Sequence, residues 1–258
     1  MSNTRIGVTL YTLRKFTKTP VDIARTLQKV KSIGYDNIQL SALGPTDPRE
    51  LAAMLHGEGL HVCPTHVAYD RLQNNLDDVL EEHRLWGCQH LAIGAMPETY
   101  WNARDNVWQT PICVRSGEGF RWFARDISPV AEKIREAGFT FSYHNHHWEL
   151  ERYEGKEGLA ILIEEIDTFW IQHGGGNPAA WIRRVVDRAP IIHFKDMAVT
   201  DRQPVMAEVG EGNMDWSDIV AACREVNAQW YVVEQDICAG DPFDSIAISL
   251  RNMQEMGL

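Results

Sequence analysis

The chain has 258 residues, 44% of them hydrophobic and 24% charged, which is the balance of a folded globular protein with a large core. Its formal net charge of −11 argues against a nucleic-acid partner and an anionic membrane surface, and no apolar run is long enough to span a bilayer. Five cysteines without a C-x-x-C spacing, and no recognisable secretory signal, predict a reduced, cytoplasmic protein without a disulfide framework.

Short apolar runs typical of buried strands alternate along the chain with stretches typical of helices. The first helix is expected from Pro20 to Ile33, with Thr19 as its N-cap and Gly34 at its end. The segment 94–117 has no clear periodicity, and such long segments are usually lids or binding loops. Strands are expected at 6–11, 37–40, 60–66, 90–93, in the alternating stretch from 139, and at 166–171, 190–195 and 231–234. Further helices are expected at 47–58, 75–86, 119–137, 159–165, 178–186, 216–226 and 241–256.

Eight predicted strands, each followed by a predicted helix, indicate repeated βα units with parallel strands. Eight such units predict a (β/α)8 TIM barrel. No linker or charge run divides the chain, so a single domain over residues 1–258 is expected. An open doubly wound sheet is the alternative.

Polar groups gather where the predicted strands end, which is where the active site of such a barrel lies. Nearly every strand ends in a group that can bind a metal, move a proton or hydrogen-bond a hydroxyl. These groups are Tyr11, Gln39, His66, His144, His146, Asp167, His193, Lys195, Glu234, Gln235 and Asp236.

The densest group is the stretch 139–149, in which aromatic residues alternate with polar ones and Glu149 follows His144 and His146. Histidine, aspartate, histidine and glutamate from strands five to eight would form a mixed nitrogen and oxygen site. Such a site suits one divalent ion: Mn²⁺, Zn²⁺, Mg²⁺ or Co²⁺.

Other side chains suit a substrate better than a metal. Tyr11, Gln39 and His66 are expected to contact substrate, and Trp101 and Trp170 offer flat apolar faces for a sugar ring. Lys195 either pairs with Asp196 or Glu208, or polarises a carbonyl and protonates an alkoxide. The glycines at 174–176 form either a phosphate cradle or a simple turn, and the turn is favoured.

The chain resembles the sugar phosphate isomerase/epimerase superfamily, the xylose isomerase-like metal-dependent TIM barrels, over nearly its whole length. The segments that carry the resemblance are 7–14, Tyr-His-Asn-His at 143–146, 166–170, 192–196, 208–213 and 233–236. The Tyr-His-Asn-His segment points to the branch with a His-Asn-His strand five.

This resemblance implies a divalent metal whose four ligands in many members are Glu, Asp, His and Glu. By position, these match His144, Asp167, His193 and Glu234, with His173 as the alternative to Asp167. A histidine thus stands where relatives have a glutamate that also moves protons. Of the family's two glutamate bases only Glu234 matches, so His146, Glu149 or Lys195 would act as the second proton-transfer group.

The predicted function is therefore a metal-dependent isomerase or epimerase of a sugar or a sugar-derived keto compound, acting through an enediolate. A metal-dependent lyase or dehydratase of a 3-keto-glycoside or keto-cyclitol is the first alternative. A sugar-binding barrel without catalysis, or an enzyme subunit, is the second. Exposed apolar loops are compatible with a homo-oligomer.

Overall fold

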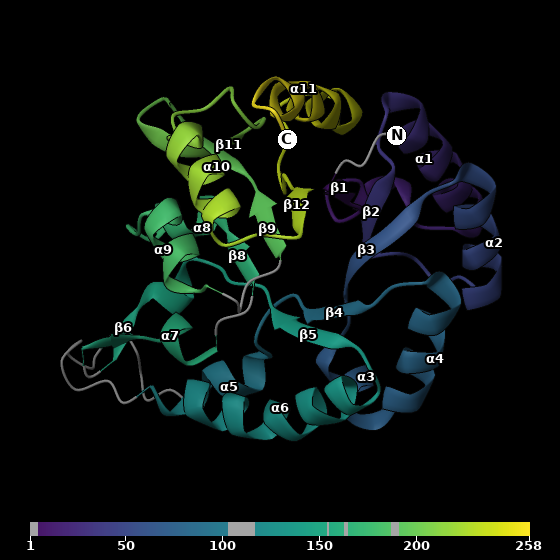
Figure 1. The fold of residues 1–258 in the computed structure, drawn as a ribbon, viewed down its shortest axis with the longest axis horizontal. Coiled ribbons are helices and arrows are strands. Elements are labelled where there is room, and N and C mark those ends of the chain that lie inside the picture. The colour runs from purple at the N-terminus through teal and green to yellow at the C-terminus, as the bar shows by residue number, and fades with distance from the viewer. Residues whose placement is uncertain (1–4, 103–116, 154, 163–164, 187–190) are drawn as a thin grey trace.

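The computed structural model describes residues 5–102, 117–153, 155–162, 165–186 and 191–258. Eight parallel strands form the centre, and the helices surround them, as Figure 1 shows. The predicted (β/α)8 TIM barrel is confirmed. Its strands are β1 (Ile6–Thr9), β2 (Asn37–Leu40), β3 (His61–His66), β4 (His90–Ile93), β5 (Thr140–Tyr143), β8 (Glu165–Asp167), β9 (Ile191–Phe194) and β12 (Trp230–Val233).

The strands pair in chain order, which is the order of a TIM barrel. The sheet runs β5-β4-β3-β2-β1-β12-β9-β8, so β1 lies in the middle and β5 and β8 at the ends. Its registers place Val8 beside Val233, and Asp167 beside His193. Because all strands run in parallel, their carboxyl ends meet on one face of the barrel.

The helices pack on the outer face of the sheet through apolar stripes. In α1, Ile23, Leu27 and Val30 recur at helical spacing and are buried. Thr19 accepts a hydrogen bond from Asp22 N at 3.2 Å, as predicted for the N-cap. The helices are α1 (Pro20–Ile33), α2 (Pro48–Glu58), α3 (Tyr69–Asn74), α4 (Leu76–Trp86), α5 (Glu98–Asn102), α6 (Glu118–Glu136), α7 (Leu159–Leu162), α8 (Thr168–His173), α9 (Pro178–Arg184), α10 (Trp216–Glu225) and α11 (Pro242–Glu255).

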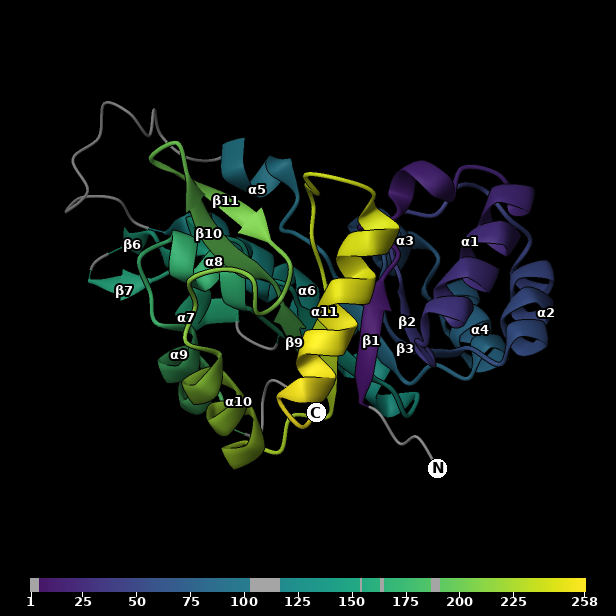
Figure 2. The ribbon, with the colours of Figure 1, turned by 90° about the horizontal axis from the view of Figure 1, so that it is seen from above.

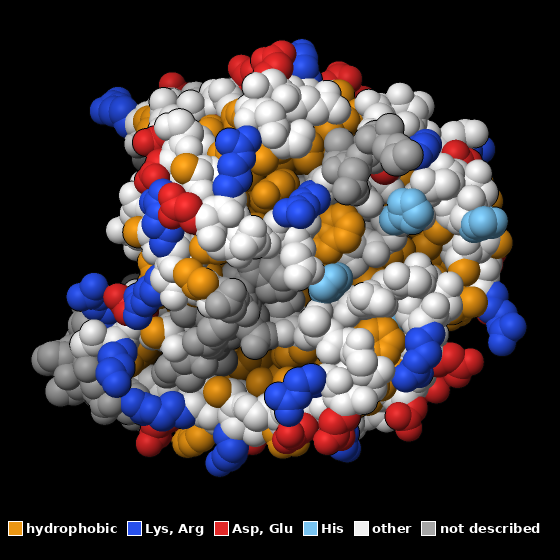
Figure 3. Space-filling model, viewed as in Figure 1, with side chains coloured by type: hydrophobic (Ala, Val, Ile, Leu, Met, Phe, Trp, Pro, Cys, Tyr) orange, Lys and Arg blue, Asp and Glu red, His pale blue; other side chains and the backbone are white. Residues whose placement is uncertain are grey.

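Two antiparallel hairpins are additions to the barrel. One joins β6 (Arg152–Tyr153) to β7 (Lys156–Glu157), and the other joins β10 (Asp196–Thr200) to β11 (Gln203–Ala207). In Figure 2 the second hairpin lies with α5 on the side of the barrel where the strands end, opposite the N-terminus. Figure 3 shows the other face, where the strands begin, with acidic and basic side chains mixed around its rim. In the described part of the chain, no helix has the length and apolarity to cross a membrane.

The sixth predicted strand, 166–171, is wrong after Asp167. The strand ends at Asp167, and α8 begins at Thr168. The cause is local, because the Asp167 side chain accepts a hydrogen bond from Trp170 N at 3.0 Å and so caps the helix. The correction leaves Asp167 at the carboxyl end of a strand.

A side chain joins the two ends of the sheet. Asn145, two residues after β5, accepts a hydrogen bond at its Oδ1 from Asp167 N, 2.9 Å away in β8. Its Nδ2 also donates to His146 O at 3.2 Å, and the residue is fully buried. This amide therefore holds β8 against β5.

We expect Asn145→Ala to lower the free energy of unfolding by about 1–3 kcal/mol, because the Asp167 amide would be left buried without its acceptor. Chemical denaturation measures the change. The matched control is Asn74→Ala at an exposed position, where we expect a change within about 0.5 kcal/mol. Equal effects of the two substitutions would contradict the role of Asn145.

Candidate active site

Four side chains from neighbouring strand ends converge on the carboxyl face of the barrel. His144 follows β5, Asp167 ends β8, His193 lies in β9 and Glu234 follows β12. One ligand atom from each lies within 4.8 Å of the others, and all four residues are buried. The structure thus brings together the four residues predicted as ligands, hereafter the four-residue cluster.

Hydrogen bonds fix the orientation of His193. Its Nδ1 lies 2.6 Å from Glu234 Oε2, so this nitrogen donates to the carboxylate. Its Nε2 lies 3.4 Å from the Nε2 of Gln39, which donates to it. The ring is thus held in one tautomer, with Nε2 carrying the lone pair that a metal requires.

Lys195 lies in the same site, with its ammonium group among three carboxylates. Its Nζ is 3.4 Å from Asp167 Oδ2 and 3.2 Å from Glu234 Oε1, and it also contacts Asp236. The side chain is fully buried, and its Nζ lies 4.7 Å from the centre of the Trp170 ring. Lys195 therefore does not form the predicted pairs with Asp196 or Glu208.

The buried charges shift one another's pKa values. Burial raises the pKa of Asp167 to about 7, although the Lys195 ammonium opposes this. Burial also raises the pKa of Glu234, but Lys195, His144 and His193 outweigh it and hold that pKa well below its usual range. Burial would lower the pKa of Lys195, but the three carboxylates raise it above its usual value. The lysine is therefore an ammonium and Glu234 a carboxylate near neutral pH.

The charges and donors of this site fit a divalent cation. When all three carboxyl groups are ionised, they exceed the one ammonium group by two negative charges in a largely buried site. The four-residue cluster offers two imidazoles and two carboxylates at mutual distances that one ion could bridge. A mixed set of imidazole and carboxylate donors of this kind can bind Mn²⁺, Co²⁺ or Zn²⁺.

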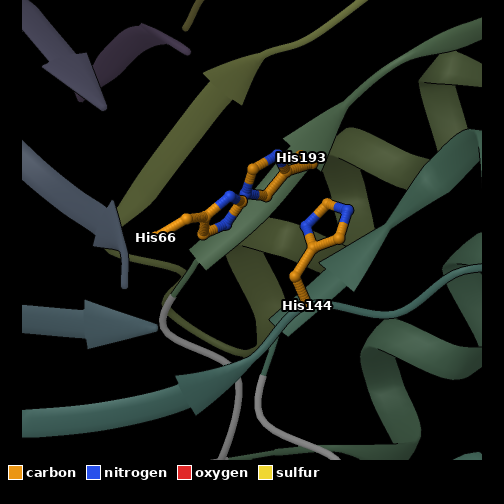
Figure 4. Close-up of side chains that lie close together, drawn as sticks. All are labelled: His66, His144 and His193. Carbon is orange, nitrogen blue, oxygen red and sulfur yellow. The ribbon is translucent and has the colours of Figure 1, made fainter. Parts of the chain in front are cut away.

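His66 brings a third imidazole to this site. Figure 4 shows His66, His144 and His193 pointing toward one another. The ring centres of His66 and His193 lie 5.7 Å apart in a stacked arrangement. His66 Nε2 is 3.2 Å from Gln39 Nε2, and its Nδ1 is 3.2 Å from Ser41 Oγ. Gln39 therefore links His66 to the four-residue cluster.

His146 lies beside the cluster in an aromatic group. Its ring stacks on Trp148 at 4.2 Å between ring centres and lies 5.4 Å from Trp170 and 5.1 Å from His144. Burial, with smaller contributions from His144 and Lys195, lowers the pKa of His146 far below its usual value. The ring is therefore neutral near neutral pH.

Glu149, predicted as a proton-transfer group, has both carboxylate oxygens in structural hydrogen bonds. Its Oε1 accepts from Tyr143 Oη at 2.6 Å, and its Oε2 accepts from His146 N at 2.8 Å. Burial raises its pKa to about 7. These bonds fix the chain after β5, so Glu149 positions His146.

The remaining predicted residues are placed as follows. Tyr11 follows β1, and the Arg14 guanidinium lies 4.3 Å from its ring centre. Trp101 belongs to α5, but its side chain lies outside the described residues. His173, the alternative ligand, is exposed and stacks on Phe169, whereas Asp167 lies in the cluster.

Asp236 was predicted as a polar group at the end of the eighth strand, and the structure adds its contact with Lys195. Two other residues of the site were not predicted. Arg14 donates to Asp236 O at 2.9 Å, and Ser41 bonds His66, but neither has a local pattern that marks it. Both were missed because their contacts are formed only when the strands have assembled into the sheet.

Comparisons with known proteins agree with this geometry. A family model described as xylose isomerase-like TIM barrel matches residues 27–255. An inosose dehydratase of Geobacillus kaustophilus (strain HTA426) is 22% identical over 255 residues, covering 85% of this chain and 82% of that protein. A sugar phosphate isomerase/epimerase from Parabacteroides distasonis ATCC 8503 superposes with a TM-score of 0.73 at 19% identity, covering 97% of each chain. An L-ribulose 3-epimerase superposes with a TM-score of 0.68 at 17% identity, covering 98% of this chain and 94% of that one. At these identities the solved structures support the fold alone.

We expect Lys195→Met to lower the free energy of unfolding by about 3–5 kcal/mol in chelator-treated protein, because three buried carboxylates would lose their cation. Chemical denaturation measures this free energy of unfolding. Lys15→Met, at an exposed position, is the control and should change stability by less than about 0.5 kcal/mol. A loss below about 1 kcal/mol in the Lys195 variant would show that the ammonium does not stabilise the site.

Proposed function

The chain belongs to the xylose isomerase-like TIM barrel family, and on that premise we propose that it is a divalent-metal-dependent isomerase or epimerase of a sugar or a sugar-derived keto compound. The observation that carries the proposal is the four-residue cluster, in which four buried donors from four strands lie within 4.8 Å of one another. Buried carboxylates lower the stability of a fold unless a cation pairs with them. A buried cluster of four such donors therefore favours a functional role.

His144, Asp167, His193 and Glu234 would hold the metal ion. When bound, such an ion supplies a Lewis acid that polarises a carbonyl and lowers the pKa of the adjacent C–H. The second carboxylate oxygen of Asp167 caps α8, and Gln39 and Glu234 orient His193, so the donors are fixed in place before substrate binds.

Glu234 is the proposed base, because it is ionised and lies at the end of a central strand. It would take the proton from the carbon next to the carbonyl. Lys195, 3.2 Å from Glu234, is the proposed acid that stabilises or protonates the developing oxyanion. Gln39 and His66 would bind substrate hydroxyls, since both lie beside the cluster and carry polar side-chain atoms into it.

A lyase or dehydratase is the second candidate, and one observation favours it. Epimerisation by two bases needs a second proton-transfer group, but His144 stands where the resemblance leads us to expect the strand-five glutamate. A base and an acid, Glu234 and Lys195, are sufficient for elimination of a β-hydroxyl or a glycosidic group. The similarity to an inosose dehydratase supports the same candidate.

We expect chelation to abolish activity and Mn²⁺, Co²⁺ or Zn²⁺ to restore it. Proton NMR in deuterated water with L-ribulose, an inosose and a 3-keto-glucoside would distinguish the two candidates. An isomer or epimer carrying deuterium identifies the isomerase, and loss of water or of the aglycone identifies the lyase. Protein that binds no stoichiometric divalent ion, and gains no activity from one, would refute both.

Glu234→Gln should lower kcat/KM by about 10²–10⁴-fold, because the amide cannot accept the substrate proton. The matched control is Glu255→Gln on the exposed surface of α11, which should leave kcat/KM unchanged. Circular dichroism and metal content, measured on the same samples, separate loss of chemistry from loss of fold or ion. Full activity of Glu234→Gln would exclude this residue as the base.

A further inference from the structure

Three imidazole rings at the carboxyl face of the barrel form a second group of metal donors, called here the three-histidine group. His66 ends β3, His144 follows β5 and His193 lies in β9. One ring nitrogen from each lies within 4.8 Å of the others, and Figure 4 shows the rings pointing toward one another. His144 and His193 also belong to the four-residue cluster, whereas His66 does not. The two groups therefore overlap, and they differ in one imidazole against two carboxylates.

The side-chain amide of Gln39 shows that two of these rings direct lone pairs at the same point. Its Nε2 lies 3.2 Å from His66 Nε2 and 3.4 Å from His193 Nε2. An amide nitrogen only donates hydrogen bonds, so both imidazole nitrogens accept. A metal ion binds imidazole through the same lone pair. The amide nitrogen thus marks a point at which both rings bind a partially positive group.

Hydrogen bonds hold the opposite nitrogens of the same two rings. Because His66 Nε2 accepts, its Nδ1 carries the ring proton and donates to Ser41 Oγ at 3.2 Å. His193 Nδ1 donates to Glu234 Oε2 at 2.6 Å. Histidines that bind metal almost always have such a partner on their other nitrogen, because it fixes the tautomer and the orientation of the ring. His66 and His193 are therefore both oriented as ligands.

His144 completes the three-histidine group from the β5 side. Its ring centre lies 4.4 Å from that of His193 and 5.1 Å from that of His66, edge to face in both cases. Two nitrogens bound tetrahedrally to Zn²⁺, each at about 2.0–2.1 Å, lie about 3.4 Å apart, so the rings need to approach one another by little more than about 1 Å. Small changes in side-chain torsion supply a movement of this size.

The three-histidine group and the four-residue cluster suit different ions. Imidazole is a good ligand for Zn²⁺, Ni²⁺ and Cu²⁺, whereas carboxylate and water oxygens suit Mn²⁺ and Mg²⁺. Zn²⁺ is also stable with three histidine ligands and an open fourth position. An ion that prefers nitrogen is therefore drawn toward His66, and an ion that prefers oxygen toward the two carboxylates.

We propose that His66, His144 and His193 form a second ion position, which takes Zn²⁺ or another divalent ion that prefers nitrogen donors, while Mn²⁺ occupies the four-residue cluster. Because the two positions share two histidines, they are alternatives within one site, and the ion present decides which of them is filled. His66 is the residue that separates the two classes of ion. This property concerns ion binding and does not depend on the reaction proposed above.

X-ray absorption spectroscopy of chelator-treated protein, reloaded with an equimolar amount of Zn²⁺ or of Mn²⁺, counts the imidazole ligands of the bound ion. We expect three imidazoles on Zn²⁺ and two on Mn²⁺. Two imidazoles on both ions would overturn the second position and leave the proposed function standing. If neither ion binds, the second position and the proposed function are both wrong.

His66→Ala removes the donor that the four-residue cluster does not use. We expect it to weaken Zn²⁺ binding by about tenfold or more and to leave Mn²⁺ affinity within about twofold of its original value, as measured by calorimetric titration. The matched control is His61→Ala at the exposed start of the same strand, which should alter neither affinity. Circular dichroism of each variant checks the fold. Unchanged Zn²⁺ affinity in folded His66→Ala protein would exclude His66 as a ligand.

Discussion

The ammonium group of Lys195 lies among the carboxylates of Asp167, Glu234 and Asp236, in a part of the barrel where all these side chains are largely buried. Isolated buried charges cost several kcal/mol each, so none of these groups would be stable there alone. The carboxylates arrive from β8 and from the end of β12, and the lysine follows β9. The site therefore exists only when the barrel has placed these strands side by side.

Asp167 shows how one side chain serves both the fold and the site. Its Oδ1 accepts from Trp170 N and starts α8, while its Oδ2 lies 3.7 Å from His144 Nε2 and 3.4 Å from Lys195. Its own backbone N–H donates to Asn145, which joins β8 to β5. An aspartate is well suited here, because its short side chain reaches the helix start and the cluster together.

Much of this arrangement could be predicted from the sequence, because parallel βα units send their strand ends to one face. Period-two alternation placed His144 on the inward face, and strand ends alone were enough to find Asp167, His193 and Glu234. The end of β8 was missed because the aromatic run after Asp167 has the composition of a strand, whereas the aspartate cap makes it a helix.

The partners of individual side chains could not be predicted in the same way. Glu149 lies three residues from His146 in sequence, yet only the structure shows that Tyr143 and a backbone amide use its oxygens. Asp196 also looked like a partner for Lys195. In the fold it accepts from Gly210 N at 2.9 Å, Gly212 N at 3.0 Å and the Trp216 indole at 2.6 Å, and so it holds the loop after β11. Contacts between distant segments depend on side-chain direction, which a single sequence does not encode locally.

The charge balance of the site is a consequence of the same arrangement. When Asp167, Glu234 and Asp236 are all ionised, they carry two negative charges beyond the ammonium group of Lys195. A divalent ion held by the four-residue cluster would cancel these two charges. Ion binding would also favour the ionised form of Asp167, because a metal ligand of this kind must be deprotonated. Occupation of the site and the charge state of its carboxyl groups would therefore depend on each other.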